Sequence, residues 1–434
     1  MTHPFSTMSE HSIARFQRLA KEGSWIVVGQ IATVTGSLAL VRFLTEHLSP
    51  IQYGELALGL TIAGLMNQAI FGGIVNGIGR YYAVAAEARD LNGYLRDSRT
   101  LLAYGTLVAT VIGAMLMIGL QWFGYSRWMG LAVAALVFSL LVAYNGAIDG
   151  IQNAARQRAI VALHGGLHAW LKILLALVFM TWLGTTSTAV VIGYAGTVLL
   201  VALSQLVFLR RTIPPRTATG VRHHAWLHRI WSYSWPFSTF GIFTWMQQVS
   251  DRWALEGFTS TMEVGQYSVL FQLGYTPVAM ATGLAVAFAA PILFQRSGDA
   301  TNAARNANVH HLTWKLTYLS VILTALGTLV AFVMHEKIFR LLVGSEYRTL
   351  SDLLPWFVLA GGLFAAGQTL SLKLMSEMKT RAIASAKIIT AILGVVLNVV
   401  GAALAGLNGV VAALLAFSAS YFVWMVLLAR KQSV

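Results

Sequence analysis

Three basic side chains, His164, His168 and Lys172, recur at every fourth residue within one apolar stretch, residues 160–183. On an α-helix this spacing places them on one face. Lys172 stands 12 residues into the stretch, roughly 18 Å along the axis at 1.5 Å per residue. An ammonium attracts a phosphate or a sugar acid, and imidazoles titrate near neutrality. The spacing predicts an anion-binding cation at Lys172 and proton-coupling groups at His164 and His168. A lysine held by carbonyls or a carboxylate in a structural network is the alternative.

Two arginines each stand 17 residues after a tryptophan that opens an apolar stretch, Arg42 after Trp25 and Arg252 after Trp235. A guanidinium donates two parallel hydrogen bonds to a phosphate, so both arginines are candidates for binding a phosphorylated cargo. The alternative is that each side chain only reaches for the membrane interface. Asp251 precedes Arg252 directly and is either its ion-pair partner or a proton site.

Two further polar faces lie where apolar stretches end. Asn76 and Arg80 stand four residues apart, and Asn145, Asp149 and Asn153 repeat the same spacing. These faces predict a place where a polar head group is first bound, with Arg80 as a cation and Asp149 as an ion-coupling acid. A solvated helix end is the alternative for both faces.

Several kinds of catalysis lack the residues they need. The chain has no cysteine, which excludes disulfides and thiolate chemistry. It also lacks the His/Glu spacing of zinc sites, a phosphate-binding glycine-rich loop with lysine, and a Gly-x-Ser-x-Gly turn. We therefore expect no enzyme, no metal and no cofactor. A membrane sugar polymerase or ligase is the rival class, but it needs a large outer loop, for which only residues 335–352 offer room.

The elements that position these residues are membrane spans. Hydrophobic residues make up 57% of the chain and charged residues 11%, whereas soluble domains average about 45–50% and 25%. Apolar runs of about 17–25 residues match a helix that crosses a ~30 Å hydrocarbon core. The sequence predicts an all-α polytopic protein whose twelve spans cover residues 25–44, 56–75, 101–120, 131–149, 160–183, 188–209, 235–255, 267–291, 316–334, 353–372, 383–404 and 410–428.

Basic residues predict the orientation. Of the 30 Lys and Arg residues, 23 fall in loops on the side of both termini and five on the opposite side. Cytoplasmic loops carry such an excess, so both termini are expected in the cytoplasm. The net charge of +14 then reflects topology, and nucleic acid is not an expected partner. Residues 1–22 are too polar for a cleaved signal and predict an amphipathic helix on the membrane surface.

The two halves of the sequence resemble each other. Gly54 follows Arg42 by 12 residues, and Gly265 follows Arg252 by 13. Together with the tryptophan spacing, this predicts two parallel six-span lobes, residues 1–209 and 231–434, joined by a basic cytoplasmic connector at 210–230. Repeats of this kind are common in secondary transporters, with substrate near the midplane.

These landmarks, with Tyr53-Gly54-Glu55-Leu56 and Val264-Gly265-Gln266-Tyr267, resemble the polysaccharide and O-antigen flippases (Wzx-type) of the multidrug/oligosaccharidyl-lipid/polysaccharide (MOP) exporter superfamily. The resemblance implies two pseudo-symmetric lobes around a central cavity, and alternating access. It implies as cargo an oligosaccharide on undecaprenyl pyrophosphate, for O-antigen, capsule or exopolysaccharide.

The same resemblance implies the bacterial inner membrane as location, membrane lipids as surroundings, and polysaccharide polymerase and assembly proteins as partners. Peptidoglycan-precursor flippases of the superfamily usually have two more spans, for which the chain has no room. A cation-coupled exporter of drugs or other small molecules, with the same twelve-span plan, is the alternative.

Overall fold

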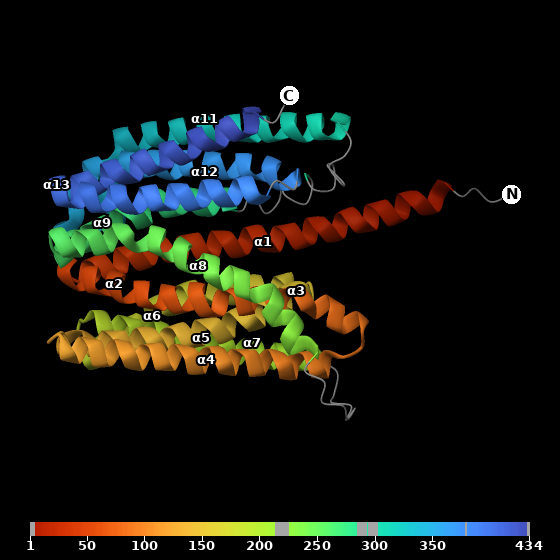
Figure 1. The fold of residues 1–434 in the computed structure, drawn as a ribbon, viewed down its shortest axis with the longest axis horizontal. Helices are drawn as coiled ribbons and strands as arrows, with labels where there is room; N and C mark the ends of the chain where they lie inside the picture. Colours follow the sequence, from red (N-terminus) through yellow and green to blue (C-terminus); the bar gives the residue numbers. More distant parts are fainter. Residues whose placement is uncertain (1–4, 213–224, 284–292, 294–302, 378–379, 432–434) are drawn as a thin grey trace. The chain divides into compact units, whose positions relative to one another are not determined.

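The computed structural model describes residues 5–212, 225–283, 293, 303–377 and 380–431, and every regular element in these ranges is a helix (Figure 1). The earlier helices are α1 (Phe5–His47), α2 (Pro50–Met66), α3 (Gly72–Glu87), α4 (Leu91–Trp122), α5 (Met129–Ala154), α6 (Arg158–Leu183) and α7 (Ser187–Thr212). The later ones are α8 (Ala225–Phe258), α9 (Thr261–Leu270), α11 (Ala303–Leu342), α12 (Leu354–Ser376) and α13 (Thr380–Lys431).

Four short elements join these helices. The π-helical turn η1 (Asn67–Phe71) connects α2 with α3, and a second, η3 (Phe271–Tyr275), continues α9. The 3-10 helices η2 (Ser126–Trp128) and η4 (Ser345–Leu353) precede α5 and α12. α1 begins at Phe5, so the segment expected to lie on the membrane surface continues directly into the first span.

Within the described ranges, nine helical runs are long and apolar enough to cross a membrane. One of them, Ser385–Arg430, has 46 residues and covers two predicted spans, 383–404 and 410–428. α8 covers the predicted span 235–255. α9 and η3 cover residues 267–275 of the predicted span 267–291, of which residues 284–291 lie outside the described residues. The prediction of an all-α, multi-pass membrane protein is confirmed.

The long run of α13 is broken at a single glycine. Gly406 has φ 54° and ψ −134°, a conformation that is essentially restricted to glycine. The amide that follows, Leu407 N, donates to Glu263 Oε2 over 2.9 Å. Backbone N–H groups at the start of a helix lack an acceptor within that helix. At the start of the second helical segment of α13, the carboxylate of Glu263 in α9 supplies this acceptor.

The chain packs as two compact units. Unit 1 consists of residues up to Leu40 together with Gly59–Ile242, and unit 2 of Val41–Leu58 together with the residues from Phe243 onward. The tip of the hairpin between α1 and α2 thus packs with the second half of the sequence. The lobes 1–209 and 231–434 remain a prediction, and residues 213–224 of the expected connector lie outside the described residues.

In unit 1, α5, α6 and α7 run side by side (Figure 1). α7 approaches α6 closely at Gly193, where an added Cβ would lie 2.8 Å from backbone atoms of Ala176. Such close contact between small residues is how helices associate where lipid supplies no hydrophobic drive. It fixes the register in which the polar residues of these three helices face one another.

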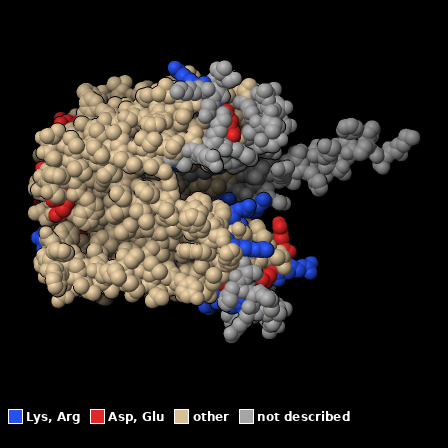
Figure 2. All heavy atoms as spheres, viewed as in Figure 1, with Lys and Arg blue, Asp and Glu red and all other residues tan. Residues whose placement is uncertain are grey.

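Charged side chains avoid the long surface of unit 1. In Figure 2, viewed as Figure 1, the surface over α4–α7 is free of charge along most of its length, and Lys and Arg gather at one end. The exposed arginines at this end are Arg80, Arg89, Arg96, Arg99, Arg156, Arg210, Arg211 and Arg229. Only the middle of these helices is therefore matched to hydrocarbon.

In unit 2, α12 is almost wholly enclosed by α11 and α13 (Figure 1). Phe357 and Leu370 are completely buried. Gly361 and Gly362 allow close approach, because a Cβ on Gly362 would overlap the side chain of Thr324 in α11. α12 thus forms the centre of this unit, and α11 exposes large apolar side chains along its length.

Candidate functional site

Lys172 is half-buried in unit 1 among aromatic rings. Its Nζ lies 4.9 Å from the ring centroid of Tyr194 in α7 and 5.8 Å from that of Phe138 in α5. In the part of the chain that the structure describes, no carboxylate or carbonyl oxygen pairs with this ammonium. Cation–π contacts stabilise the charge without engaging an anion, so the structural network considered from the sequence is not what surrounds Lys172.

The two histidines of α6 differ in their partners. His164 is buried, with Nδ1 2.8 Å from the carbonyl oxygen of Ile160 and Nε2 3.0 Å from Oγ of Ser204 in α7. A carbonyl only accepts, so Nδ1 carries the proton that it donates, and His164 ties α6 to α7. His168 Nε2 is buried and has no hydrogen-bond partner among the described residues. Of the two, His168 has the nitrogen that is open to a proton or a ligand.

Asp149 belongs to a polar network between α5 and α7. Its Oδ1 accepts a hydrogen bond of 2.5 Å from Nε2 of Gln205, whose Oε1 accepts from Nδ2 of Asn145. Gln152, which is fully buried, donates to the backbone oxygen of Gln205 over 3.4 Å. Buried polar groups in a span are costly unless they are paired, so this network joins the two helices at a defined register.

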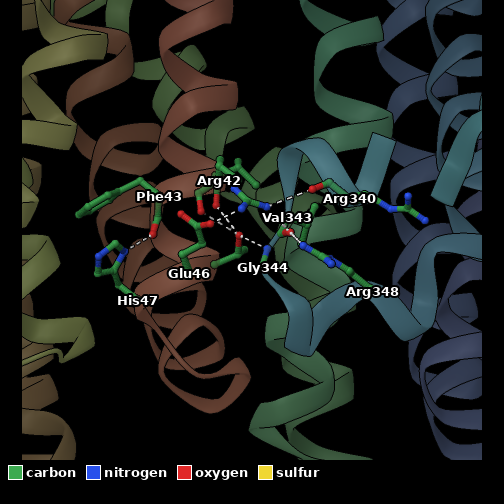
Figure 3. Close-up of polar contacts among 10 residues, drawn as sticks. Arg42, Phe43, Glu46, His47, Arg340, Val343, Gly344 and Arg348 are labelled. Carbon is green, nitrogen blue, oxygen red and sulfur yellow. Dashed lines mark hydrogen bonds and ion pairs between the residues drawn. The ribbon is translucent and has the colours of Figure 1, made fainter. Parts of the chain in front are cut away.

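Arg42 belongs to α1, and its side chain contacts the C-terminal end of α11 within unit 2. Its Nη1 donates to the backbone oxygen of Val343 over 2.6 Å and to that of Arg340 over 3.3 Å, while Nη2 pairs with Glu46 (Figure 3). The carbonyls at the C-terminus of a helix lack intrahelical donors and carry partial negative charge. Arg42 therefore caps α11 in this structure.

The neighbours of Arg42 join the tip of the α1–α2 hairpin to the rest of unit 2. Gly344 N donates to Oγ1 of Thr45 over 2.9 Å, and the hydroxyl of Tyr347 donates to the backbone oxygen of Leu48 over 2.9 Å. A polar pocket of about 230 Å³ lies beside these bonds, with Arg348 in its wall (Figure 3). The bonds explain why residues 41–58 pack with the second half.

The glycines matched in the two halves of the sequence, Gly54 and Gly265, lie against each other. A Cβ on Gly54 would overlap the backbone oxygen of Thr261, and a Cβ on Gly265 would overlap that of Pro50. The starts of α2 and α9 therefore cross with their backbones in contact. This crossing is a physical reason for glycine at both positions.

Asp251 and Arg252 form the second polar group of unit 2. Asp251 is buried, and its Oδ2 accepts from the hydroxyl of Tyr267 over 2.6 Å. Arg252 donates its backbone N–H to Oδ1 of Asp251 over 2.7 Å, and its Nη1 lies 3.9 Å from the same oxygen. Its guanidinium carbon lies 5.2 Å from the ring centroid of Phe271. The aspartate and the arginine are thus ion-pair partners in this structure.

Arg80 stands apart from the other candidates. It is exposed near the end of α3, as is Asn76, and the described residues include no hydrogen-bond or ion-pair partner for its side chain. The structure thus divides the predicted residues between its units. Lys172, His164, His168, Asp149 and Arg80 belong to unit 1, while Arg42, Asp251 and Arg252 belong to unit 2.

Two buried polar residues were missed by the sequence reasoning. Gln205 in α7 connects Asn145 with Asp149, and Asn398 in α13 donates to Oγ of Ser250 over 2.8 Å, next to Asp251. Each interrupts an apolar span, and that interruption is the signal that identifies them. The search for spaced charges overlooked them because both side chains are neutral.

Solved structures with similar folds are transporters and a flippase. The lipid II flippase MurJ, in an inward closed conformation, matches with a TM-score of 0.69 at 11% identity, over 95% of this chain and 87% of that one. An inward-facing multidrug resistance MATE family transporter of the MOP superfamily matches with 0.63 at 14%, over 93% and 96%. The MATE transporter VcmN of Vibrio cholerae matches with 0.62 at 12%, over 96% of both chains.

The chain therefore shares the fold of these transporters, one of which is a member of the MOP superfamily that the sequence resembles. No family profile and no curated protein matches the sequence itself. Identities of 11–14% establish a shared fold and no more.

Proposed function

We propose that this protein is a secondary transporter that moves an oligosaccharide linked to undecaprenyl pyrophosphate from the cytoplasmic to the periplasmic leaflet of a bacterial inner membrane. The observation that carries the proposal is Lys172, a cation within a membrane span that aromatic rings surround and no carboxylate of the described chain neutralises. An intramembrane charge of this kind is costly and marks a functional site by default.

An anionic cargo offsets the cost of the charge. The rings of Phe138 and Tyr194 interact with the ammonium through their faces, which leaves its N–H groups as donors. A pyrophosphate supplies negative charge and several acceptor oxygens, and charge-assisted bonds of this type are stronger than neutral ones. In the proposed cycle, Lys172 binds the pyrophosphate or an acidic sugar, and Arg80 attracts it from the cytoplasm.

We further propose that an ion gradient drives the cycle through Asp149 and His168. Among the described residues, Asp149 has one hydrogen-bond partner, Gln205 Nε2, and Nε2 of His168 has none. Each of these two side chains can bind and release a proton, and Asp149 can instead bind a cation, as the transporter alternates between its two access states. In the second half of the sequence, Asp251 is the proposed coupling acid. In the first half, His164 joins α6 to α7. The product, presented in the periplasm, is then available to a polymerase and its assembly partners.

A cation-coupled multidrug exporter is the second candidate. The buried carboxylate of Asp251 favours it, as does the similarity in fold to MATE transporters. Exported drugs are often cationic, and a cationic substrate needs acids in its path. An unneutralised lysine would repel a cationic substrate, because like charges repel. The role of Lys172 therefore distinguishes the two candidates.

The test is transport by the full chain in proteoliposomes. A fluorescent undecaprenyl-pyrophosphate oligosaccharide is incorporated, and its appearance in the opposite leaflet is measured with an impermeant quencher. Lys172→Ala is expected to lower the rate about ten- to hundredfold, the loss of ~1.5–3 kcal/mol from one charge-assisted bond. Lys172→Arg keeps the charge and is expected to retain most activity.

Arg127→Ala is the matched control, because Arg127 is exposed and its guanidinium lies over Trp128, away from Lys172. Full-rate transport by a Lys172→Ala protein that inserts normally would overturn the assignment of Lys172. No glycolipid movement by the wild type, together with gradient-driven uptake of a lipophilic cation, would favour the drug exporter.

A further inference from the structure

An apolar groove of about 390 Å³ lies within unit 2, between α11, α12 and residues 277–282. On α11 it is lined by Leu316, Leu319, Leu323 and Gly327. Pro277 lies on the opposite side, just after the π-helical turn η3. Grooves of this volume fall within the range of small-ligand sites.

Three of the four hydroxyls that line the groove, those of Thr282, Thr324 and Thr369, are engaged by backbone oxygens, and the fourth belongs to Ser320. Thr324 donates to the carbonyl oxygen of Ser320 over 2.7 Å, and Thr282 donates to that of Val278 over 2.9 Å. Both bonds return to the preceding turn of the same helix, which satisfies a hydroxyl donor in an apolar setting. The groove thus offers almost nothing to a polar ligand, and an apolar cavity does not hold water well. Its chemistry fits a hydrocarbon chain.

The groove is open along the exposed side of α11. Leu319 and Leu323 line it and are 52% and 58% exposed. They belong to the candidate span Ala307–Leu342, which has a mean hydropathy of 2.1. Exposed leucines at mid-span meet acyl chains in a membrane, so a lipid tail can enter the groove from the side without leaving an apolar medium.

The groove has the depth of one leaflet. From Leu316 to Gly327, α11 rises about 17 Å at 1.5 Å per residue, roughly half of a ~30 Å hydrocarbon core. In the orientation predicted from the basic residues, Leu316 is near the cytoplasmic surface and Gly327 is past the midplane. The groove therefore covers the leaflet from which the proposed cargo is collected.

We propose that this groove binds the polyisoprenyl tail of the cargo lipid in the cytoplasmic leaflet, while Lys172 binds the pyrophosphate or an acidic sugar. This inference rests on the proposed function. The tail would dock in unit 2, which places binding of the tail and binding of the anion by Lys172 on different units. Ordinary phospholipid chains are the competing occupant.

Photocrosslinking in proteoliposomes tests the occupant directly. A photoreactive benzoyl-phenylalanine is placed at Leu323 in the groove or at Leu329, which is 60% exposed on the same helix but outside the groove. The liposomes contain phosphatidylethanolamine, phosphatidylglycerol and undecaprenyl phosphate, and adducts are identified by mass spectrometry. We expect undecaprenyl adducts to be enriched at Leu323 over Leu329 and to decrease when farnesyl phosphate competes.

A groove-filling variant tests whether the site matters for transport. Ala281 lines the groove and is exposed, so Ala281→Phe fills space without disturbing the core. Displacing two methylenes at ~0.8 kcal/mol each is expected to raise the KM for the glycolipid about tenfold with little change in kcat. Ala412→Phe, at an exposed position of α13 outside the groove, is the control and should match the wild type.

Each outcome has a distinct meaning. Equal undecaprenyl labelling at Leu323 and Leu329, or phospholipid adducts alone, would overturn the tail site, and so would an unchanged KM in Ala281→Phe. These results leave the proposed function intact if Lys172→Ala still lowers the transport rate about ten- to hundredfold. If the wild type moves no glycolipid but Leu323 labels with undecaprenyl phosphate, the proposed function fails and the tail site stands as a polyprenyl-lipid site.

Discussion

At the scale of residues, the buried charges differ in how well they are satisfied. Asp251 accepts hydrogen bonds from Tyr267 and Arg252, whereas Asp149 accepts one, from Gln205. Within the described ranges, the ammonium of Lys172 lies over the rings of Tyr194 and Phe138 and has no carboxylate partner. A fully bonded charge stabilises one arrangement, while a charge with unused bonding capacity has something left to offer a ligand or an ion. This gradation is why we assign binding to Lys172 and coupling first to Asp149.

If Asp149 couples transport to the ion gradient, its replacement should abolish coupling while the protein still exchanges substrate across the membrane. Asp149→Asn removes the charge but preserves a carbonyl oxygen that Gln205 Nε2 can reach, so the contact between α5 and α7 is kept. We expect gradient-driven accumulation to fall at least tenfold while exchange without a gradient persists, as measured in proteoliposomes with and without an imposed ion gradient. Asp352→Asn, at an exposed acid, should behave as the wild type. Unchanged accumulation in Asp149→Asn would exclude this residue from coupling.

At the scale of elements, the hairpin tip of α1 and α2 is joined to unit 2 by polar bonds and by a crossing of glycines. Arg42 and Thr45 bond to the segment after α11, and Gly54 meets the start of α9. Both helices of the hairpin pass from one unit to the other, α1 at Leu40–Val41 and α2 at Leu58–Gly59. The bonds at the tip hold residues 41–58 within unit 2.

The glycine crossing makes a prediction about stability. Gly265→Ala puts a methyl group into the backbone of Pro50 and is expected to cost ~1–3 kcal/mol, as overpacking usually does. Thermal unfolding in detergent should show a lower Tm. Gly257→Ala is the matched control, because nothing lies within 4 Å of its added Cβ, and replacing a helical glycine should leave Tm equal or higher. Equal melting of the two variants would show that the crossing is looser than described.

Arg42 separates a structural role from a binding role. Arg42→Ala removes the hydrogen bonds to the carbonyls of Arg340 and Val343 and leaves Val343 with the longer, 3.5 Å bond from Arg348 Nη2, so we expect a loss of ~1–3 kcal/mol in unfolding free energy. If capping is its whole role, the KM for glycolipid stays the same in the folded fraction. A KM that rises with no change in Tm would instead indicate that Arg42 contacts the cargo. Both quantities come from one purified preparation.

At the scale of the whole molecule, the charge pattern predicts the topology. The natural sequence has no cysteine, so single cysteines report on it without a background. With both termini in the cytoplasm, Ser126→Cys and Thr185→Cys, at exposed sites between spans, should react with an impermeant maleimide added to intact spheroplasts. Glu87→Cys, exposed at the end of α3, should react only after the membrane is opened. The reverse pattern would invert the proposed orientation.

The site was only partly foreseeable from the sequence. The spacing of His164, His168 and Lys172 correctly placed them along one helix, because a four-residue period is a local property of the chain. The carbonyls that Arg42 caps belong to residues about 300 positions away, at Arg340 and Val343. No local pattern encodes such a partner, and neutral Gln205 and Asn398 gave no charge to notice.

The sequence by itself determined the membrane-spanning helices, because the length of an apolar run and the distribution of arginines act locally against a bilayer of fixed thickness. Only the tertiary structure decided which polar groups pair. In the tertiary structure, Gly54 contacts the backbone of α9, and residues 41–58 pack within unit 2. Among the described residues, Lys172 contacts aromatic rings and no carboxylate. These outcomes depend on packing between distant segments, where backbone contact and side-chain reach decide the partners.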